Sequence, residues 1–170
     1  IARAAGLDRL AVGRGPGGFT SLRIGLGVAQ GIALAHDLPV APISSLAALA
    51  HAAAKAPEPG RVLALIDARM GEVFAGWFEC GEGTFKALAP EAVLATGELG
   101  VPGPGPWRVV GSGLAAHHRL IRSRLGDEGM TWQPDAWPLA ESLLALADQV
   151  EPVPAWRVEP KYVRDRVTQA

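Results

Sequence analysis

Short continuous apolar runs alternate along the chain with longer segments in which apolar residues recur at helical spacing. The runs predict buried strands, which we place at residues 10–13, 39–43, 61–66, 85–88 and 107–111. The longer segments predict helices, which we place at residues 20–36, 46–56, 112–125 and 138–149. Residues 72–78 alternate in character after a turn at 67–71, so we expect them to form a hairpin with the strand before that turn. Strands that alternate with helices in this way indicate an α/β protein.

Hydroxyl side chains stand where two of these helices begin. A serine or threonine at the N-cap accepts hydrogen bonds from the first free amides of a helix. We therefore expect Thr20 or Ser21 to cap the first helix, and Ser44 or Ser45 to cap the second.

Proline divides the chain into parts. The cluster PEPG at residues 57–60 breaks regular structure and marks the best domain boundary. It separates residues 1–56 from residues 57–150, and each part has the pattern of a small α/β unit. Residues 151–170 are interrupted by proline and predict an extended tail that wraps back on the molecule.

The composition argues against several classes of function. The chain has 170 residues, 49% of them hydrophobic, and a net charge of −1, so it lacks the basic excess usual for a nucleic-acid-binding protein. The single cysteine, Cys80, excludes an intramolecular disulfide, and the four histidines show no metal-ligand spacing. No apolar run reaches the roughly 18–20 residues of a membrane span. We therefore expect a cytoplasmic protein with no metal and no membrane partner.

A glycine-rich turn, GRGPGGFTSLRIG at residues 13–25, follows the first strand. Gly13, Gly15 and Gly18 match the dinucleotide fingerprint, but the next strand ends without the acidic residue that would hold a ribose. Phe19 stands where a Walker loop requires lysine. Two interpretations stay open, an anion site at the helix N-terminus assisted by a neighbouring arginine and a tight structural turn. We favour the structural turn.

The helix after this turn carries three glycines, Gly25, Gly27 and Gly31. Each costs roughly 0.5–1 kcal/mol relative to alanine, and the close approach of another backbone would offset that cost. Apolar residues occupy nearly the whole circumference of this helix. The pattern predicts a buried helix that is covered in part by a partner.

Four tryptophans lie late in the chain, Trp107, Trp132, Trp137 and Trp156. Indole rings can stack on the bases of RNA. Buried indoles contribute large apolar areas to a core, and we interpret these four as packing residues.

Three blocks of the sequence, taken together, resemble the TsaB (YeaZ) family. The glycine turn is similar to the family pattern GRGPGSFTGLRIG, and residues 66–74 (IDARMGEVF) are similar to IDARxGEVY. Residues 159–164 (EPKYVR) resemble the family's EPxYLR tail. Gly18 and Ser21 depart from the pattern, each by one small residue for another. The family's opening strand hairpin and first helix have no counterpart here, so the resemblance implies a chain truncated at its N-terminus.

The resemblance implies an actin/Hsp70-like ATPase fold with two ribonuclease H-like α/β lobes, the first of them incomplete. It also implies a non-catalytic subunit in the synthesis of N6-threonylcarbamoyladenosine next to the anticodon of tRNA. The partners it implies are the catalytic paralogue TsaD, the ATPase TsaE and a second copy of the chain, with tRNA reached only through the complex. No tightly bound cofactor is expected, and weak binding of an adenine nucleotide at the interface of the complex stays open.

The resemblance and the apolar helix together select a candidate subunit interface. Its residues are Gly17, Phe19, Thr20, Leu22, Arg23, Leu26, Gly27, Gln30, Gly31 and Leu34. The charged part of the 66–74 block forms a second candidate group, made of Asp67, Arg69 and Glu72. This group either contacts a partner, tRNA or a nucleotide across the cleft between the lobes, or contains an Asp–Arg pair that fixes a turn and caps strand ends, and we favour the turn.

Two other classes of function stay open. An ATPase or peptidase-like enzyme of the same superfamily is opposed by the absence of the family's AIDTS-like phosphate-binding stretch and of an H-E-x-x-H zinc motif. A direct tRNA-binding module is opposed by the balanced charge of the chain.

Overall fold

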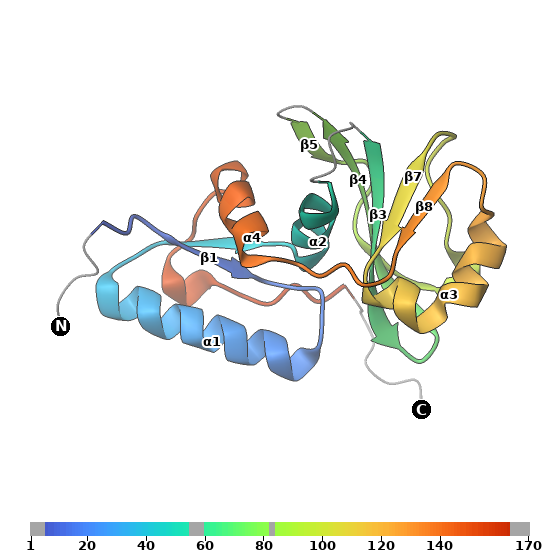
Figure 1. Cartoon of the computed structure of the whole chain (residues 1–170). Helices are drawn as coiled ribbons and strands as arrows, with labels where there is room; N and C mark the ends of the chain where they lie inside the picture. Colours follow the sequence, from blue (N-terminus) through green and yellow to red (C-terminus); the bar gives the residue numbers. More distant parts are fainter. Residues whose placement is uncertain (1–5, 55–59, 82–83, 164–170) are drawn as a thin grey trace.

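The computed structural model describes residues 6–54, 60–81 and 84–163. Residues 57–59 of the expected domain boundary and Arg164 of the tail block lie outside the described residues. The helices are α1 (Phe19–His36), α2 (Ser45–Ala53), α3 (Ser112–Leu125) and α4 (Ala140–Leu146), with short 3₁₀ turns η1 (Thr96–Glu98), η2 (Ala147–Gln149) and η3 (Ala155–Arg157) (Figure 1). The strands are β1 (Leu10–Gly13), β2 (Val40–Ile43), β3 (Gly60–Arg69), β4 (Glu72–Gly81), β5 (Thr84–Ala87), β6 (Ala92–Ala95), β7 (Trp107–Val110) and β8 (Met130–Gln133).

The strands form two sheets. Strands β1 and β2 make a parallel pair, and the larger sheet has the order β5-β4-β3-β7-β8, with β6 also paired to β4. Strands β3 and β4 form the expected antiparallel hairpin, while β7 and β8 extend the sheet in parallel. This arrangement confirms a mixed α/β fold.

The larger sheet is covered on both faces. Successive residues of a strand point to opposite faces, so Val62 and Ala64 of β3 pack with α2, whereas Leu63 and Leu65 pack with α3. Helix α2 lies between the two sheets, has no exposed residue, and buries Leu46 and Leu49 completely (Figure 1).

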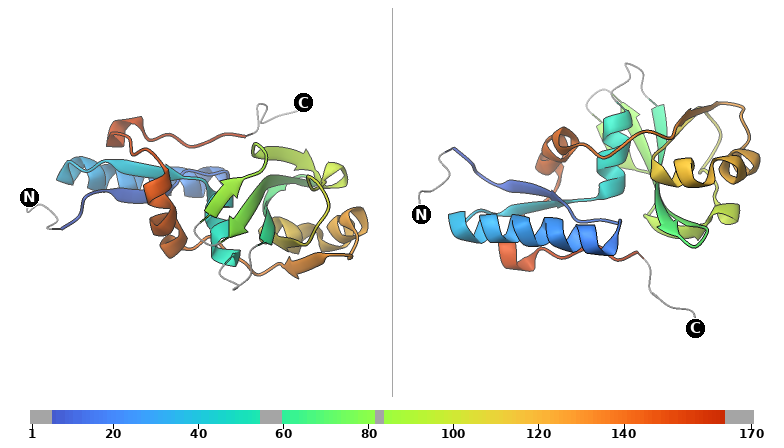
Figure 2. Two further views of the ribbon diagram at one scale, coloured as in Figure 1. Left: turned by 90° about the horizontal axis from the view of Figure 1, so that it is seen from above. Right: turned by 60° about the horizontal axis from the view of Figure 1, so that its bottom comes forward.

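The smaller sheet has α1 on one side and α4 on the other (Figure 2). Val40 packs with α1, while Ala41 and Ile43 pack with the end of α4. Helix α4 therefore lies against β1 and α2, although it falls within the 57–150 unit defined from the sequence. The described part of the tail runs beside β2, where Val153 forms an antiparallel bridge with Val40.

The two predicted helix caps have different outcomes in the structure. The hydroxyl of Ser44 accepts hydrogen bonds from the amides of Leu46 (3.1 Å) and Ala47 (3.2 Å), which confirms the cap of α2. The predicted cap of α1 is wrong, because that helix begins at Phe19 with Gly18 at its N-cap and no side-chain cap. The Ser21 hydroxyl instead donates to the Gly18 carbonyl at 2.9 Å.

Two strands and two tryptophans differ from the expectations. Strands β6 (AVLA) and β8 (MTWQ) are segments of only four residues and were not predicted. Trp107 is buried as expected, but Trp137 and Trp156 are 64% and 66% exposed, so neither is a core residue. None of the described helices is long and apolar enough to cross a membrane.

Burial makes Cys80 a weakly acidic thiol. Desolvation raises its pKa from 9.0 to about 11. Because the native pKa is the higher one, the stabilising effect of the neutral thiol is complete below pH 9 and is lost as the pH rises towards 11. We expect the free energy of unfolding, measured by urea denaturation at several pH values, to fall more steeply from pH 9 to 11 in the wild-type chain than in Cys80→Ala. Equal slopes for the two proteins would contradict this expectation.

Candidate functional site: the exposed face of α1

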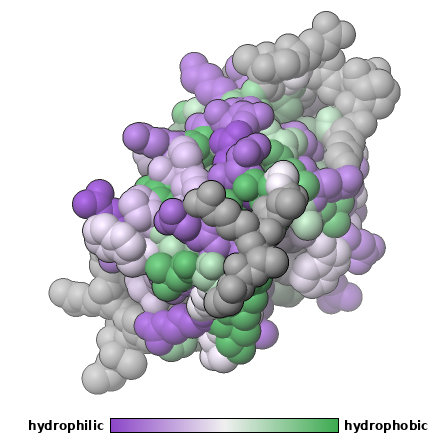
Figure 3. Space-filling model, turned by 90° about the vertical axis from the view of Figure 1, so that its left-hand side faces the viewer, coloured by the Kyte–Doolittle hydropathy of each residue, from purple (hydrophilic) through white to green (hydrophobic). Residues whose placement is uncertain are grey.

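One face of α1 exposes apolar side chains to solvent. Of its 18 residues only Leu26 and Ala33 are buried. Its large apolar residues with exposed fractions between 44% and 63% are Phe19, Ile24, Val28, Ile32 and Leu34. Seen from the left-hand side of Figure 1, hydrophobic residues gather at the lower part of the molecule, where α1 lies (Figure 3). The helix is therefore buried along one stripe only, and the described part of the chain leaves the opposite stripe uncovered.

The three glycines of α1 open onto empty space. A Cβ atom built on Gly25, Gly27 or Gly31 meets no atom within 4 Å among the described residues. The expected close approach therefore does not occur within the described part of the chain. Since glycine destabilises a helix by roughly 0.5–1 kcal/mol per position, a contact with another molecule is the remaining physical reason for small residues here.

The predicted interface residues fall into two groups. Phe19, Thr20, Arg23, Gly27, Gly31 and Leu34 are exposed, and Gly17 is half-buried. The other three, Leu22, Leu26 and Gln30, point into the chain itself. Leu26 belongs to the core, Leu22 lies against Gly15, and the Gln30 amide donates to the Val158 carbonyl at 3.0 Å.

Sequence reasoning missed Ile24, Val28 and Ile32, which form a continuous exposed row. Their spacing of four residues was a usable signal. However, α1 is apolar on both stripes, so the pattern alone did not decide which stripe faces the core.

The glycine turn fastens the start of α1 to its surroundings. The Arg14 amide donates to the Ile43 carbonyl (2.8 Å), the Ser45 amide donates to the Gly15 carbonyl (2.9 Å), and the Lys161 amide donates to the Arg14 carbonyl (2.8 Å). Gly15 has a φ of +101°, and a Cβ there would lie 2.9 Å from a methyl group of Leu22. These contacts favour the structural interpretation of the turn over an anion site.

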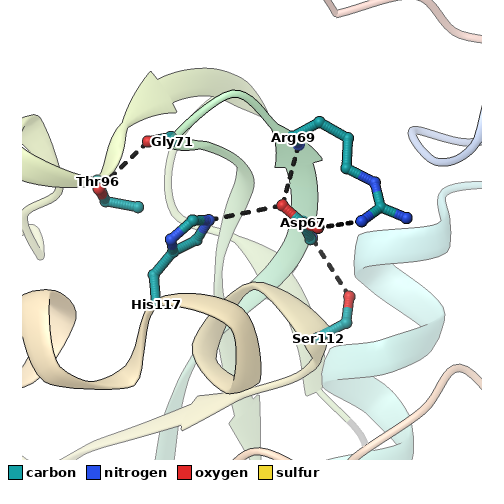
Figure 4. Close-up of polar contacts among 6 residues, drawn as sticks. All are labelled: Asp67, Arg69, Gly71, Thr96, Ser112 and His117. Carbon is teal, nitrogen blue, oxygen red and sulfur yellow. Dashed lines mark hydrogen bonds and ion pairs between the residues drawn. The ribbon is translucent and has the colours of Figure 1, made fainter.

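The second candidate group lies at the end of the β3–β4 hairpin (Figure 4). The Asp67 carboxylate accepts a hydrogen bond from the Arg69 amide at 2.9 Å and lies 3.4 Å from the Arg69 guanidinium. Its other neighbour is His117, whose Nε2 is 3.5 Å away, and the Asp67 amide donates to the Ser112 hydroxyl at 3.2 Å. Glu72 sits in the β4 ladder opposite Arg69.

The Asp67 cluster holds a strained turn. Arg69, Met70 and Gly71 all have positive φ angles, of 66°, 55° and 78°. Thr96 donates from both its amide (3.0 Å) and its hydroxyl (3.2 Å) to the Gly71 carbonyl. The polar contacts thus tie the hairpin to α3 and η1, which supports the turn-fixing interpretation. His117, Ser112 and Thr96 were not predicted, because nothing local in the sequence indicates contacts across 25 to 50 positions.

The Asp67 cluster is not arranged as a nucleophile relay. In such a relay the histidine lies between the serine and the carboxylate. Here Ser112 is bonded to the Asp67 backbone, and no hydrogen bond links it to His117 in the described part of the chain. Nor do the described residues include three or more His, Cys, Asp or Glu side chains grouped to hold a metal ion.

The turn-fixing interpretation predicts different effects for the two members of the Asp–Arg pair. We expect Asp67→Ala to lower the free energy of unfolding by about 1–2 kcal/mol, because the Arg69 amide loses its acceptor. We expect Arg69→Ala to change it by less than about 1 kcal/mol, since the Arg69 side chain is 86% exposed. Urea denaturation measures both effects. An Arg69→Ala protein that keeps its full stability but no longer supports tRNA modification would indicate a contact role instead.

Comparisons with known proteins identify the class of protein to which this fold belongs. The family model described as TsaD, tRNA N6-adenosine threonylcarbamoyltransferase, matches residues 2–123. The chain is therefore related to the proteins of tRNA threonylcarbamoyladenosine synthesis. Two curated relatives, from Escherichia coli (strain K12) and Haemophilus influenzae (strain ATCC 51907 / DSM 11121 / KW20 / Rd), are both named tRNA threonylcarbamoyladenosine biosynthesis protein TsaB. They are 38% and 36% identical, and each match covers 95% of this chain and 72% of the relative.

Solved structures indicate the same family as the curated relatives. YeaZ from Pseudomonas aeruginosa has a TM-score of 0.82 and 36% sequence identity, covering 92% of this chain and 74% of that chain. A crystal structure of an uncharacterized protein with similarity to peptidase YEAZ, also from Pseudomonas aeruginosa, has the same TM-score and identity and covers 93% of this chain and 74% of that one. The chain belongs to the TsaB family, and the resemblance found in its sequence is confirmed.

Proposed function

We propose that this protein is a non-catalytic subunit in tRNA threonylcarbamoyladenosine synthesis that docks the catalytic paralogue TsaD on α1. The observation that carries the proposal is the uncovered face of α1, where Ile24, Val28 and Ile32 form an exposed row beside glycines with open space at their Cβ positions. Contiguous exposed apolar surface of this kind marks interaction sites. A helix with small residues on its face allows a partner's backbone to approach closely.

The proposal includes the finer architecture. We infer an actin/Hsp70-like arrangement in which the two sheets belong to two ribonuclease H-like lobes. Strand β1 pairs with β2 on one side and with no strand on the other among the described residues. This free edge supports an incomplete first lobe, because a parallel sheet is normally larger and covered.

The remaining partners follow from the same role. TsaE and tRNA join through the complex, a second copy competes with TsaD for the α1 face, and the complex works in the cytoplasm. The isolated chain holds no cofactor tightly, and an adenine nucleotide would bind weakly and only in the complex. The engagement of the glycine turn in the chain's own hydrogen bonds supports this view.

The test is size-exclusion chromatography with light scattering on the chain alone and mixed with the TsaD of the same organism. A one-to-one complex is expected. A homodimer that ignores TsaD would overturn the proposal. Magnesium-dependent ATP turnover by the isolated chain would favour an enzyme, and a salt-dependent tRNA shift by the isolated chain would favour a direct tRNA-binding module.

A further inference from the structure

The C-terminal tail runs along α1 for most of the length of the helix. Two hollows lie in the seam between them, of about 340 Å³ and 460 Å³. The first is lined by Arg23, Leu26 and Gln30 of α1 and by residues 158–160 and 162 of the tail. The second is lined by Ala33 and Leu34 at the end of α1, residues 37–39, and residues 152–156 of the tail. The surface next to the exposed face of α1 is therefore hollowed at both ends.

An aromatic and cationic cluster marks one end of this seam. The Arg23 guanidinium lies 3.5 Å from the centre of the Phe19 ring, and its Nη2 donates to the Tyr162 hydroxyl at 2.9 Å. Both rings are more than half exposed. Arg23 is the only Asp, Glu, Lys or Arg residue of α1, so the one full charge on the helix is held by a tail residue.

Trp156 marks the other end of the seam. It is 66% exposed and lines the larger hollow together with Leu34, which is 62% exposed. The Arg157 guanidinium lies 4.7 Å from the centre of its indole ring. An indole left in solvent contributes little to the stability of its own fold, whereas Trp, Tyr and Arg are the residues most enriched among interface hot spots.

The size of α1 shows that the helix alone is too small for stable docking. Its 18 residues make a cylinder about 27 Å long, so a stripe about 10 Å wide covers about 270 Å². A stable interface takes about 800 Å² from each partner. The partner must therefore also contact surface next to α1. The seam between α1 and the tail is adjacent to the helix and has exposed aromatic residues at both ends.

We propose that residues 152–162 form the second half of the docking surface, with Trp156 and Tyr162 as its anchors. This rests on the proposed function, because the occupant is the same TsaD-type subunit that covers α1. That subunit inserts an apolar side chain into the hollow beside Trp156 and presents a carboxylate to Arg23. Gly27, Gly31 and Leu34 lie on the tail side of the exposed face and complete the surface.

The test compares two exposed apolar side chains. Trp156→Ala is expected to weaken binding to TsaD about thirtyfold or more, as loss of a hot-spot residue does. Leu120, which is 48% exposed on α3 and lies outside the proposed docking surface, is the control. Leu120→Ala is expected to leave the dissociation constant within about threefold. Isothermal titration calorimetry measures binding, and thermal unfolding confirms that both variants keep the wild-type fold.

Two substitutions of Tyr162 separate the contribution of its ring to binding from that of its hydroxyl. Tyr162→Phe keeps the ring but removes the hydroxyl that accepts from Arg23, and we expect a smaller loss of binding than in Tyr162→Ala. Wild-type affinity in both Trp156→Ala and Tyr162→Ala would overturn the tail proposal and leave the docking role of α1 intact. Failure of the wild-type chain to bind TsaD would overturn both proposals.

Discussion

Replacing Gly27 by leucine is expected to abolish pairing with TsaD while leaving the fold intact. Gly27 is exposed, and a Cβ atom there meets no atom within 4 Å among the described residues, so a larger side chain can extend into solvent. Leucine is also a better helix former than glycine, by roughly 0.8–1 kcal/mol. Thermal stability should therefore stay level or rise, whereas an isobutyl group on the docking face holds the partner's backbone away. Light scattering on the mixture and thermal unfolding of the variant alone measure the two effects.

Gly97→Leu provides the control. Gly97 is exposed and also has open space at its Cβ position. It lies in η1, which packs against α3, outside the docking surface around α1. We expect this variant to pair with TsaD. Normal pairing by Gly27→Leu, or equal loss in both variants, would contradict the docking surface described above.

Substituting Gly111 by alanine is expected to destabilise the protein by about 3–5 kcal/mol, a large part of a typical stability of about 5–15 kcal/mol. Gly111 has φ +103° and ψ −176°, a region that essentially only glycine adopts. A Cβ atom there would lie 2.4 Å from the Leu65 carbonyl oxygen and 2.5 Å from a methyl group of Leu49. The backbone of β3 cannot move aside without disturbing the centre of the larger sheet.

Urea denaturation measures this loss, and Gly97→Ala is the control. Gly97 is exposed, and a Cβ there meets no atom within 4 Å. We expect its substitution to change the free energy of unfolding by less than about 0.5 kcal/mol. A Gly111→Ala protein as stable as wild type would show that the junction between β7 and α3 is looser than the structure indicates.

Local patterns predicted well what depends on neighbouring residues. The cap of α2 at Ser44, the buried strand β2 and the β3–β4 hairpin were all indicated by residues within a few positions of each other. Strand β8 was not, because its four residues, MTWQ, are too few for their alternation of apolar and polar side chains to stand out. Its place at the sheet edge depends on pairing with β7, which lies more than 20 positions away in sequence.

The candidate site divides in the same way. The glycines and apolar residues of α1 were visible in the sequence, and they indicated a helix that contacts something. The contacts that shape the site were not visible, because Arg23 meets Tyr162 across 139 positions and Asp67 meets Ser112 across 45. The sequence gives no local sign of such pairs, because each residue would suit its own helix or strand equally well if its side chain pointed into solvent.

By itself, the sequence determined the α/β alternation, the positions of the glycine turn and the hairpin, and the family to which the chain belongs. These features rest on backbone preferences and on the periodicity of apolar residues, both of which act between near neighbours. Only the tertiary structure decided which stripe of α1 is buried, that Trp156 is exposed, and that the tail lies beside the docking helix. A helix that is apolar on both stripes can bury either one, and the choice is made by the surface that β1, β2 and the tail present to it.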